Sequence, residues 1–324
     1  MRLDAALDVP LADVAATAQA AEAAGVAALW TTETKHDPFL PLSLAAAATE
    51  RIELWTAVAV AFARSPVATA SSAWDLARLS DGRFILGLGS QVRAHVEHRF
   101  GMPWPDRPVA RMREYVQVVR AAWEAWQTGV RPSFRGEHYR FTLMTPFFDP
   151  GPIEHPMIPV YLAGVGAGMT RLAGEVADGL LVHPFHTRAW LEDVVRPAVT
   201  AGARAAGRND ADIRFAGSII VATTEEEARE ARRAIGFYAS TPTYRPVLEH
   251  HGWGEIGDAL SAHARRGRWD EMADTVTDEM LNACAVVADP ADLRTAIERR
   301  ASGLFDRVSP YAPYGTGPWT HLAP

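Results

Sequence analysis

The chain has 324 residues, 48% of them hydrophobic, which is enough to bury a large core. Its 39 Asp and Glu outnumber its 32 Lys and Arg, and the resulting net charge of −7 argues against a nucleic-acid-binding surface. A single cysteine, Cys284, excludes a disulfide framework, and no apolar run or leader of the kind that membrane and secreted proteins carry is visible. We therefore expect a cytoplasmic protein that acts on a small molecule, without a nucleic-acid or membrane partner.

Strands and helices alternate along the first 90 residues. Ser65 and Pro66 suit the N-cap and first turn of a helix, and Asp81-Gly82 suits its end. A strand, a helix and a strand of these lengths form a βαβ unit, whose two strands are parallel. The pattern predicts strands over 3–9, 27–31, 52–60 and 84–88, and helices over 10–24, 40–49 and 65–80.

The alternation continues to the end of the chain. Four more strands are predicted over 158–163, 180–183, 213–221 and 283–288, with helices over 109–126, 169–177, 190–206, 225–238 and 290–300. A hairpin turned at Gly136 and a Pro-rich loop follow the fourth strand, and the tail after Asp306 is expected to lie on the surface. Eight strands in βα order favour one domain over 1–324, a (β/α)8 TIM barrel with insertions at about 100–157 and 240–282, over an open doubly wound sheet.

Short motifs follow these strands in barrel order. They read TETKHDPFLPL at 32–42, TAVAV at 56–60, RSP at 64–66, SDGRFILGLG at 80–89, RMREY at 111–115, TLMTPFFDP at 142–150, LAGVGAGMT at 162–170 and AGEVADGLLVHP at 173–184. This ordered set resembles the bacterial luciferase-like (luciferase-like monooxygenase) flavin and deazaflavin oxidoreductases, and it is most similar to their coenzyme F420-dependent branch. The resemblance implies a TIM-barrel oxidoreductase in which the cofactor carries the redox step.

His36 is the first candidate for chemistry. It follows the second strand, and an imidazole can donate or accept a proton near neutral pH. The resemblance places a catalytic or cofactor-facing histidine in this loop, whereas the simpler interpretation is a loop histidine that bonds the backbone. Glu33 and Asp37 either orient His36 in catalysis or cap the helix that starts near Pro38.

The cofactor-binding candidates lie in three further segments. The resemblance implies a non-proline cis peptide at Ala57-Val58 behind the cofactor ring. A Gly-rich turn before a helix offers bare N–H groups to a phosphate, and its residues are Gly164, Val165, Gly166, Gly168 and Met169. Gly89, Ser90, Gln91 and His183, at the ends of the fourth and sixth strands, are the remaining candidates.

The resemblance implies hydride transfer between coenzyme F420 and an organic substrate. The polyanionic tail of F420 favours basic residues at the mouth, but Lys35 is the only lysine, so FMN with a flavin monooxygenase activity stays an alternative. A non-catalytic flavin-binding protein is a third interpretation. A metal-dependent hydrolase using His36, Asp37, His183 and His186 is a fourth; because no HxH or HExxH motif is present, we expect no metal site. A homodimer is left open.

Overall fold

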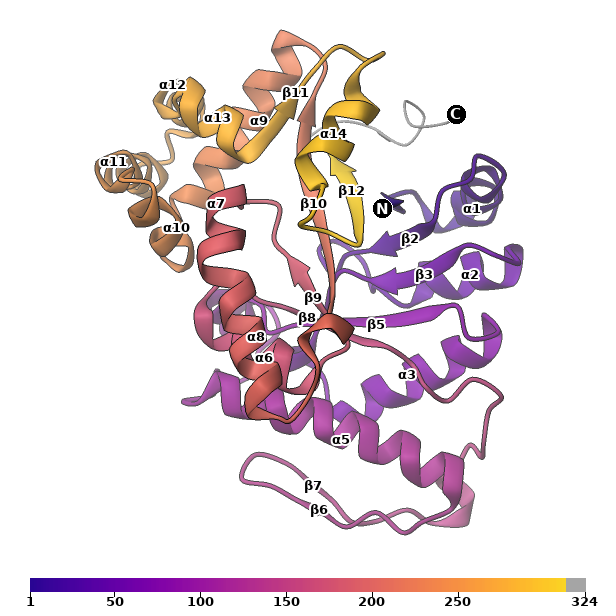
Figure 1. Ribbon diagram of the computed structural model, residues 1–324. Helices are drawn as coiled ribbons and strands as arrows, with labels where there is room; N and C mark the ends of the chain where they lie inside the picture. The colour runs from indigo at the N-terminus through magenta and orange to yellow at the C-terminus, as the bar shows by residue number, and fades with distance from the viewer. Residues whose placement is uncertain (313–324) are drawn as a thin grey trace.

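The computed structural model describes residues 1–312, and these form a closed barrel of parallel strands surrounded by helices (Figure 1). Each barrel strand pairs with its neighbours in parallel register, and the last one returns to the first. The predicted TIM barrel is therefore confirmed. The eight barrel strands are β1 (Arg2–Ala6), β2 (Ala28–Thr31), β3 (Glu53–Thr56), β5 (Phe84–Gly89), β8 (Val160–Ala163), β9 (Gly179–Val182), β10 (Arg214–Ala222) and β12 (Arg307–Tyr311).

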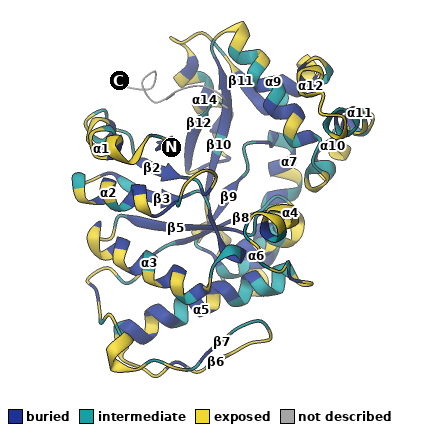
Figure 2. Ribbon diagram, turned by 180° about the vertical axis from the view of Figure 1, so that it is seen from behind, coloured by how far each residue is buried: buried dark blue, intermediate teal, exposed yellow. Residues whose placement is uncertain are grey.

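Helices cover the outside of the barrel, with their outer faces exposed and the strands buried (Figure 2). Ser65 accepts a hydrogen bond from the Ala68 N–H and Pro66 takes the first position of α3, as the sequence predicts. The covering helices are α1 (Val14–Ala23), α2 (Leu40–Ala48), α3 (Pro66–Leu79), α5 (Pro108–Thr128), α6 (Ala167–Val176), α8 (Arg196–Ala205), α9 (Glu225–Ala239) and α14 (Leu293–Ala301).

The two long insertions have their own elements. The first contains the hairpin strands β6 (Phe134–Arg135) and β7 (Arg140–Phe141) and the short 3-10 turn Pro146–Phe148, and the short helix α4 (Arg93–His98) precedes it. The second contains α10 (Arg245–His250), α11 (Gly254–Arg265), α12 (Trp269–Thr275) and α13 (Asp278–Cys284). Where one helix was predicted over 190–206, α7 (Arg188–Trp190) and α8 flank a π-helical turn at Leu191–Val195.

The prediction of the eighth strand was wrong. Residues Ala285–Val287 form a strand, β11, but it pairs only with the far end of β10 and does not reach β1. The strand that closes the barrel is β12, which pairs with both β10 and β1, so residues 307–311 do not lie on the surface as expected. The sequence did not reveal this strand because two of its buried residues, Arg307 and Ser309, are polar. The alternation of apolar and polar residues by which a strand is recognised is therefore absent. The remainder of the predicted surface tail, 313–324, lies outside the described residues.

The predicted strand over 52–60 is interrupted. It consists of β3 and the short β4 (Ala59–Val60), separated by a cis peptide at Ala57-Val58, which is the cis bond that the resemblance implied. At the interruption, the Thr56 hydroxyl donates to the Gly87 carbonyl at 2.7 Å and accepts from the Gly87 N–H at 3.0 Å. A side chain thus holds β3 against β5 where the backbone pairing stops.

Side chains fill the N-terminal end of the barrel interior. Arg307 donates from Nε and Nη2 to the two Asp4 carboxylate oxygens at 2.6 and 3.1 Å, and it also lies 2.8 Å from the Glu53 carboxylate. Trp30 and Trp55 belong to the apolar layer packed inside the barrel. Because this filling blocks the N-terminal end, a ligand must enter from the C-terminal end of the strands, as it does in other barrels of this kind.

The structure also shows the environment of Cys284 and the character of the helices. Cys284 is buried, and burial raises the pKa of its thiol to about 12, so the thiol is unreactive at neutral pH. Within residues 1–312, none of the helices combines the length and the apolar character needed to cross a membrane.

Candidate functional site

A cavity of about 650 Å³ opens beside the C-terminal ends of β1 and β2. This volume is in the range of small-molecule sites, and the position is the end at which barrel enzymes bind their ligands. The residues around the cavity combine apolar walls with a few polar groups. They are Ala6, Leu7, Asp8, Val9, Pro10, Leu11, Trp30, Thr31, Thr32, Thr34, Lys35, His36, Asp37 and Pro41.

His36 lies in the loop between β2 and α2 and lines this cavity. Its side chain is exposed, and no residue of the part of the chain that the structure describes forms a hydrogen bond with its ring. The backbone-bonding interpretation therefore finds no support, and the ring is free to face a bound ligand. Its catalytic role stays a prediction.

Glu33 and Asp37 flank His36 in the sequence, but their carboxylates form hydrogen bonds and ion pairs with other residues. The Glu33 carboxylate is buried and accepts from the Val60 N–H at 2.6 Å and from Arg64. Asp37 accepts from the N–H groups at the start of α2, those of Phe39 at 2.8 Å and Leu40 at 3.2 Å, and it pairs with Arg64 at 3.0 Å. These contacts favour a role for both carboxylates in positioning the His36 loop. The predicted helix-capping role is found at Asp37, which accepts hydrogen bonds from the N–H groups at the start of α2.

Arg64 is the residue of this network that sequence reasoning missed. It stands in the RSP motif, where only the serine and proline were used, as a helix start. Its partners Glu33 and Asp37 lie 31 and 27 residues earlier, so no local pattern reveals the contact.

Small side chains gather over the apolar layer at the C-terminal end of the barrel. Ala57, Val58 and Ala163 pack on that layer and remain partly accessible. Gly89 is buried and packs closely against Val58, since a Cβ at Gly89 would lie only 2.6 Å from Val58 Cγ2. We call Ala57, Val58 and Ala163 the shelf, and Gly89 packs against Val58 and Ala163 of this shelf.

Ser90 and Gln91 complete the turn that leaves β5. The Ser90 hydroxyl donates to the Gln91 carbonyl at 3.1 Å, and the Gln91 side-chain oxygen accepts from the Val92 N–H at 2.9 Å. Gln91 has a φ of +62°, which is uncommon for a residue other than glycine. Both polar side chains thus have local backbone partners, and their cofactor contacts stay predictions.

The Gly-rich turn leads from β8 directly into α6. Gly166 is the N-cap of α6, and no side chain caps the helix. A Cβ at Gly164 would lie 3.0 Å from the Thr170 N–H nitrogen, whereas a Cβ at Gly166 would meet nothing within 4 Å. An uncapped helix start next to open space suits an anion, because its first N–H groups lack partners and carry the positive end of the helix dipole.

His183 ends β9 and is packed between aromatic rings. Its ring centroid lies 4.6 Å from that of Tyr238 and 4.7 Å from that of Tyr244. Burial, with a smaller effect of His186, lowers the pKa of His183 to about 3, and its Nδ1 accepts from the Phe185 N–H at 3.1 Å. The imidazole is therefore neutral and can offer a ligand only an uncharged Nε2–H.

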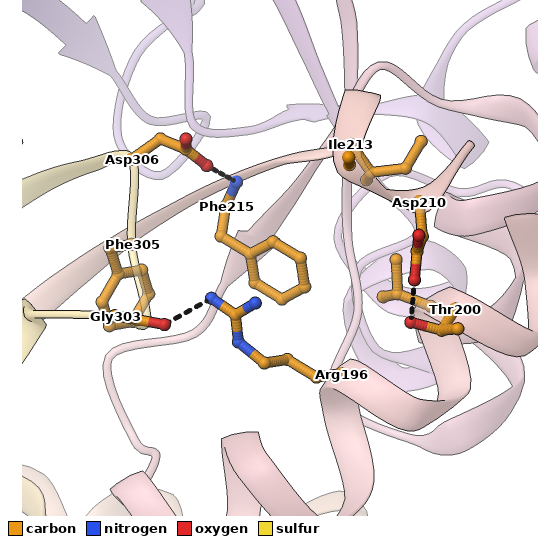
Figure 3. A pocket seen from close by; sticks show the side chains of 10 residues that line it. Arg196, Thr200, Asp210, Ile213, Phe215, Gly303, Phe305 and Asp306 are labelled. Atoms are coloured by element: carbon orange, nitrogen blue, oxygen red, sulfur yellow. Dashed lines mark hydrogen bonds between the residues drawn. The ribbon is translucent and has the colours of Figure 1, made fainter.

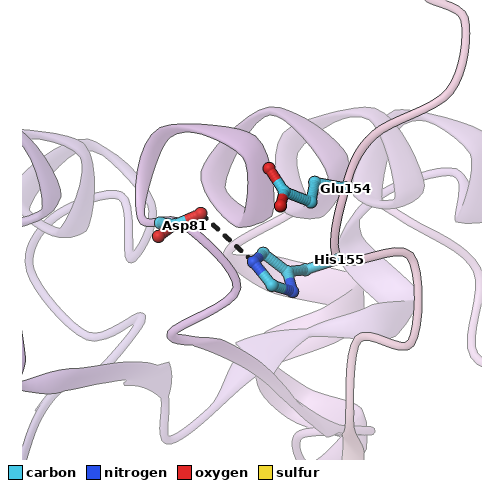
Figure 4. A group of neighbouring side chains, drawn as sticks. All are labelled: Asp81, Glu154 and His155. Atoms are coloured by element: carbon cyan, nitrogen blue, oxygen red, sulfur yellow. Dashed lines mark hydrogen bonds and ion pairs between the residues drawn. The ribbon is translucent and has the colours of Figure 1, made fainter.

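The residues proposed for a metal-dependent hydrolase do not meet in one place. His186 is 2% exposed and its Nδ1 pairs with the His183 carbonyl at 2.8 Å, whereas His36 is exposed on the cavity. Among residues 1–312, the side chains close enough to share a metal ion are Asp81, Glu154 and His155 (Figure 4). All three are exposed, and they precede β5 and β8, at the N-terminal end of the barrel. They are not part of the candidate site.

A second cavity, of about 410 Å³, also lies at the N-terminal end, beside the starts of β10 and β12 (Figure 3). Arg196 spans it, with its guanidinium 4.6 Å from the Phe215 ring centroid and one nitrogen 2.9 Å from the Gly303 carbonyl. Asp306 accepts from the Phe215 N–H at 2.7 Å. These contacts join α8 to the strand starts, and the filled barrel separates them from His36.

Comparison with known proteins agrees with this geometry. The family profile described as luciferase-like monooxygenase matches residues 2–307. The chain belongs to this family. The resemblance drawn from the motifs is thereby confirmed, and so is the expectation of an enzyme.

Individual relatives in the luciferase-like family cover nearly the whole chain. The uncharacterized protein Rv1360 of Mycobacterium tuberculosis is 45% identical over 96% of this chain and 93% of its own length. The F420-dependent glucose-6-phosphate dehydrogenase of Beutenbergia cavernae is 32% identical over 82% of this chain and 81% of its own. The structure of the coenzyme F420-dependent tetrahydromethanopterin reductase of Methanopyrus kandleri superimposes with a TM-score of 0.80 at 24% identity, covering 99% of this chain and 95% of that one, which shows the shared fold.

Proposed function

We propose that this luciferase-like enzyme transfers a hydride between coenzyme F420 and a small organic substrate. The observation that carries the proposal is the arrangement of the C-terminal end of the barrel. The shelf, the uncapped start of α6 and the His36 cavity all lie there, and together they match a flat ring, a phosphate and a substrate. The relative named as an F420-dependent dehydrogenase supports F420 as the ring and phosphate carrier.

Each part of the site has a distinct task in this proposal. Ala57 and Val58 support the flat ring from the β3 side, and the N–H groups at Gly166 and Gly168 bind the phosphate. His36 donates or accepts the proton that accompanies hydride transfer, a step worth about 10²–10⁴-fold when the group is well placed. The deazaflavin supplies the hydride chemistry when bound.

An FMN-dependent monooxygenase is the second candidate, because small side chains on the shelf and an uncapped α6 start do not discriminate between the two rings and phosphates. The specific observation in its favour is the shortage of lysine: Lys35 is the only one in the chain, and F420 carries a long polyanionic tail. The third interpretation, a non-catalytic flavin-binding protein, is disfavoured by the family match and by the free His36 ring. A homodimer and the absence of nucleic-acid and membrane partners stay predictions.

Calorimetric titration of the purified protein with F420 and with FMN tests the proposal. We expect F420 to bind at least about tenfold more tightly, a difference of about 1.4 kcal/mol. Equal affinities, or tighter binding of FMN, would contradict the F420 proposal and favour the flavin monooxygenase. Oxidation of the bound reduced cofactor by organic acceptors, with and without oxygen, then separates the two reactions.

A further inference from the structure

We propose that Arg64 is a positioning residue, which holds the His36 loop in a fixed relation to the cofactor shelf. The inference rests on the proposed function, since it concerns the placement of His36 against a bound cofactor. It goes beyond the proposal because Arg64 touches neither the 650 Å³ cavity nor the Gly-rich turn.

The guanidinium of Arg64 forms ion pairs with a residue on each side of His36 in its loop. One nitrogen pairs with Glu33, three residues before His36, and the other pairs at 3.0 Å with Asp37, the residue after it. The Arg64 side chain is 22% exposed, and its guanidinium lies 5.3 Å from the Phe39 ring centroid. The loop around His36 is thus tied at two points to a single planar group.

The same network reaches the shelf through Glu33. The Glu33 N–H donates to the Val58 carbonyl at 3.3 Å, and the Glu33 carboxylate accepts from the Val60 N–H at 2.6 Å. Because the Glu33 side chain is only 7% exposed, its carboxylate depends on these donors in place of water. A movement of Glu33 would therefore move the backbone of the shelf and the His36 loop together.

Arg64 itself is fixed by the next element of the chain. It immediately precedes Ser65, the N-cap of α3, and follows the 3-10 turn Ala61–Ala63. α3 runs beside α2, whose start is capped by Asp37. Arg64 thus connects the start of α3 with the start of α2, and His36 lies between the two points of attachment.

The chemistry of arginine suits this task. Its planar fork directs separate N–H groups at two carboxylates, whereas the ammonium of lysine is a point charge on a flexible stem. Misplacement of a reacting group by about 1 Å can reduce a rate by about 10²-fold. Arg64→Lys should therefore retain the positive charge but lose the simultaneous hydrogen bonds to Glu33 and Asp37.

The test measures the rate at which bound reduced cofactor is oxidised in a single turnover, and the cofactor dissociation constant, in Arg64→Lys. We expect the rate to fall by about tenfold or more and the dissociation constant to stay within about threefold. The decisive comparison is the double variant with His36→Ala. If Arg64 acts through His36, the lysine substitution should cause little further loss once the imidazole is absent.

Two controls make the outcome specific. Arg120→Gln breaks a single, more exposed arginine–carboxylate pair, to Asp178 at 2.9 Å, near the N-terminal end of the barrel, and it should leave the rate unchanged. Asp37→Asn removes one of the two attachments and can still accept hydrogen bonds at the start of α2. It should slow turnover by a few-fold in wild type and not in the His36→Ala background, and it serves as the test if Arg64→Lys does not fold.

Three results would overturn the inference while leaving the proposed function intact. They are a wild-type rate in folded Arg64→Lys, losses from the Arg64 and His36 substitutions that multiply independently, and an equal loss in Arg120→Gln. Failure of the wild-type protein to bind either F420 or FMN would instead overturn the proposed function itself.

Discussion

Replacing Gly166 with Asp should weaken cofactor binding without unfolding the barrel. Gly166 is the N-cap of α6 with φ −82° and ψ 155°, a conformation open to any residue, and a Cβ there would meet no atom within 4 Å. Asp is also among the best N-cap residues, exceeding Gly by a few tenths of a kcal/mol. The free energy of unfolding should therefore stay the same or rise slightly.

The effect on binding should have the opposite sign. A phosphate bound by the first N–H groups of α6 would lie about 4 Å from the new carboxylate, where two unit charges interact by about 4 kcal/mol at an effective dielectric constant of about 20. Screening by salt reduces this repulsion. We expect the binding free energy to become less favourable by about 2–4 kcal/mol. The dissociation constant of the cofactor should therefore rise by roughly 30- to 1000-fold.

Calorimetric titration with F420, and urea unfolding of the same preparation, measure the two effects separately. Gly166→Asn is the matched control, because its side chain has nearly the same volume and capping ability but no charge. Binding by Gly166→Asp within threefold of wild type would show that no phosphate is bound at this turn, and an equal loss in Gly166→Asn would show that charge repulsion does not cause the loss.

Three other substitutions test the remaining parts of the structure. His36→Ala should slow single-turnover oxidation of the bound reduced cofactor by about 10²-fold or more, with cofactor affinity within a few-fold, and retention of the rate in stopped-flow measurements would remove His36 from the mechanism. Asp4→Ala should lower the free energy of unfolding by about 3 kcal/mol, the lower end of the cost of breaking a buried ion pair, because Arg307 loses its two-point partner but keeps Glu53 at 2.8 Å, and a loss below about 1 kcal/mol in urea would contradict this. Burial lowers the pKa of His186 to about 4, so as the pH falls below about 6.5 the unfolded chain takes up the proton first and stability is lost. Wild type should lose about 1.5 kcal/mol more than His186→Gln between pH 6.5 and 5, and identical pH profiles would refute the shift.

Local patterns were sufficient for most of the fold. The Ser65-Pro66 start of α3 and the apolar run of β5 depend on residues adjacent in the chain, and both were found where expected. The alternation of such units favoured a parallel barrel, because a helix between two strands leaves little choice of strand direction. The motifs also placed the His36 loop and the Gly-rich turn at the C-terminal ends of β2 and β8.

The closing strand and the roles of the polar side chains were decided only by tertiary structure. β12 carries an inward arginine, which is stable inside the barrel because the carboxylates of Asp4, 303 residues earlier, and Glu53 meet it. Glu33 was predicted to orient His36 or to cap a helix, and its actual partners, the Val60 N–H and Arg64, lie 27 and 31 residues further along the chain. These outcomes depend on desolvation and charge pairing between distant segments, and such energies exist only after the chain has brought the partners together.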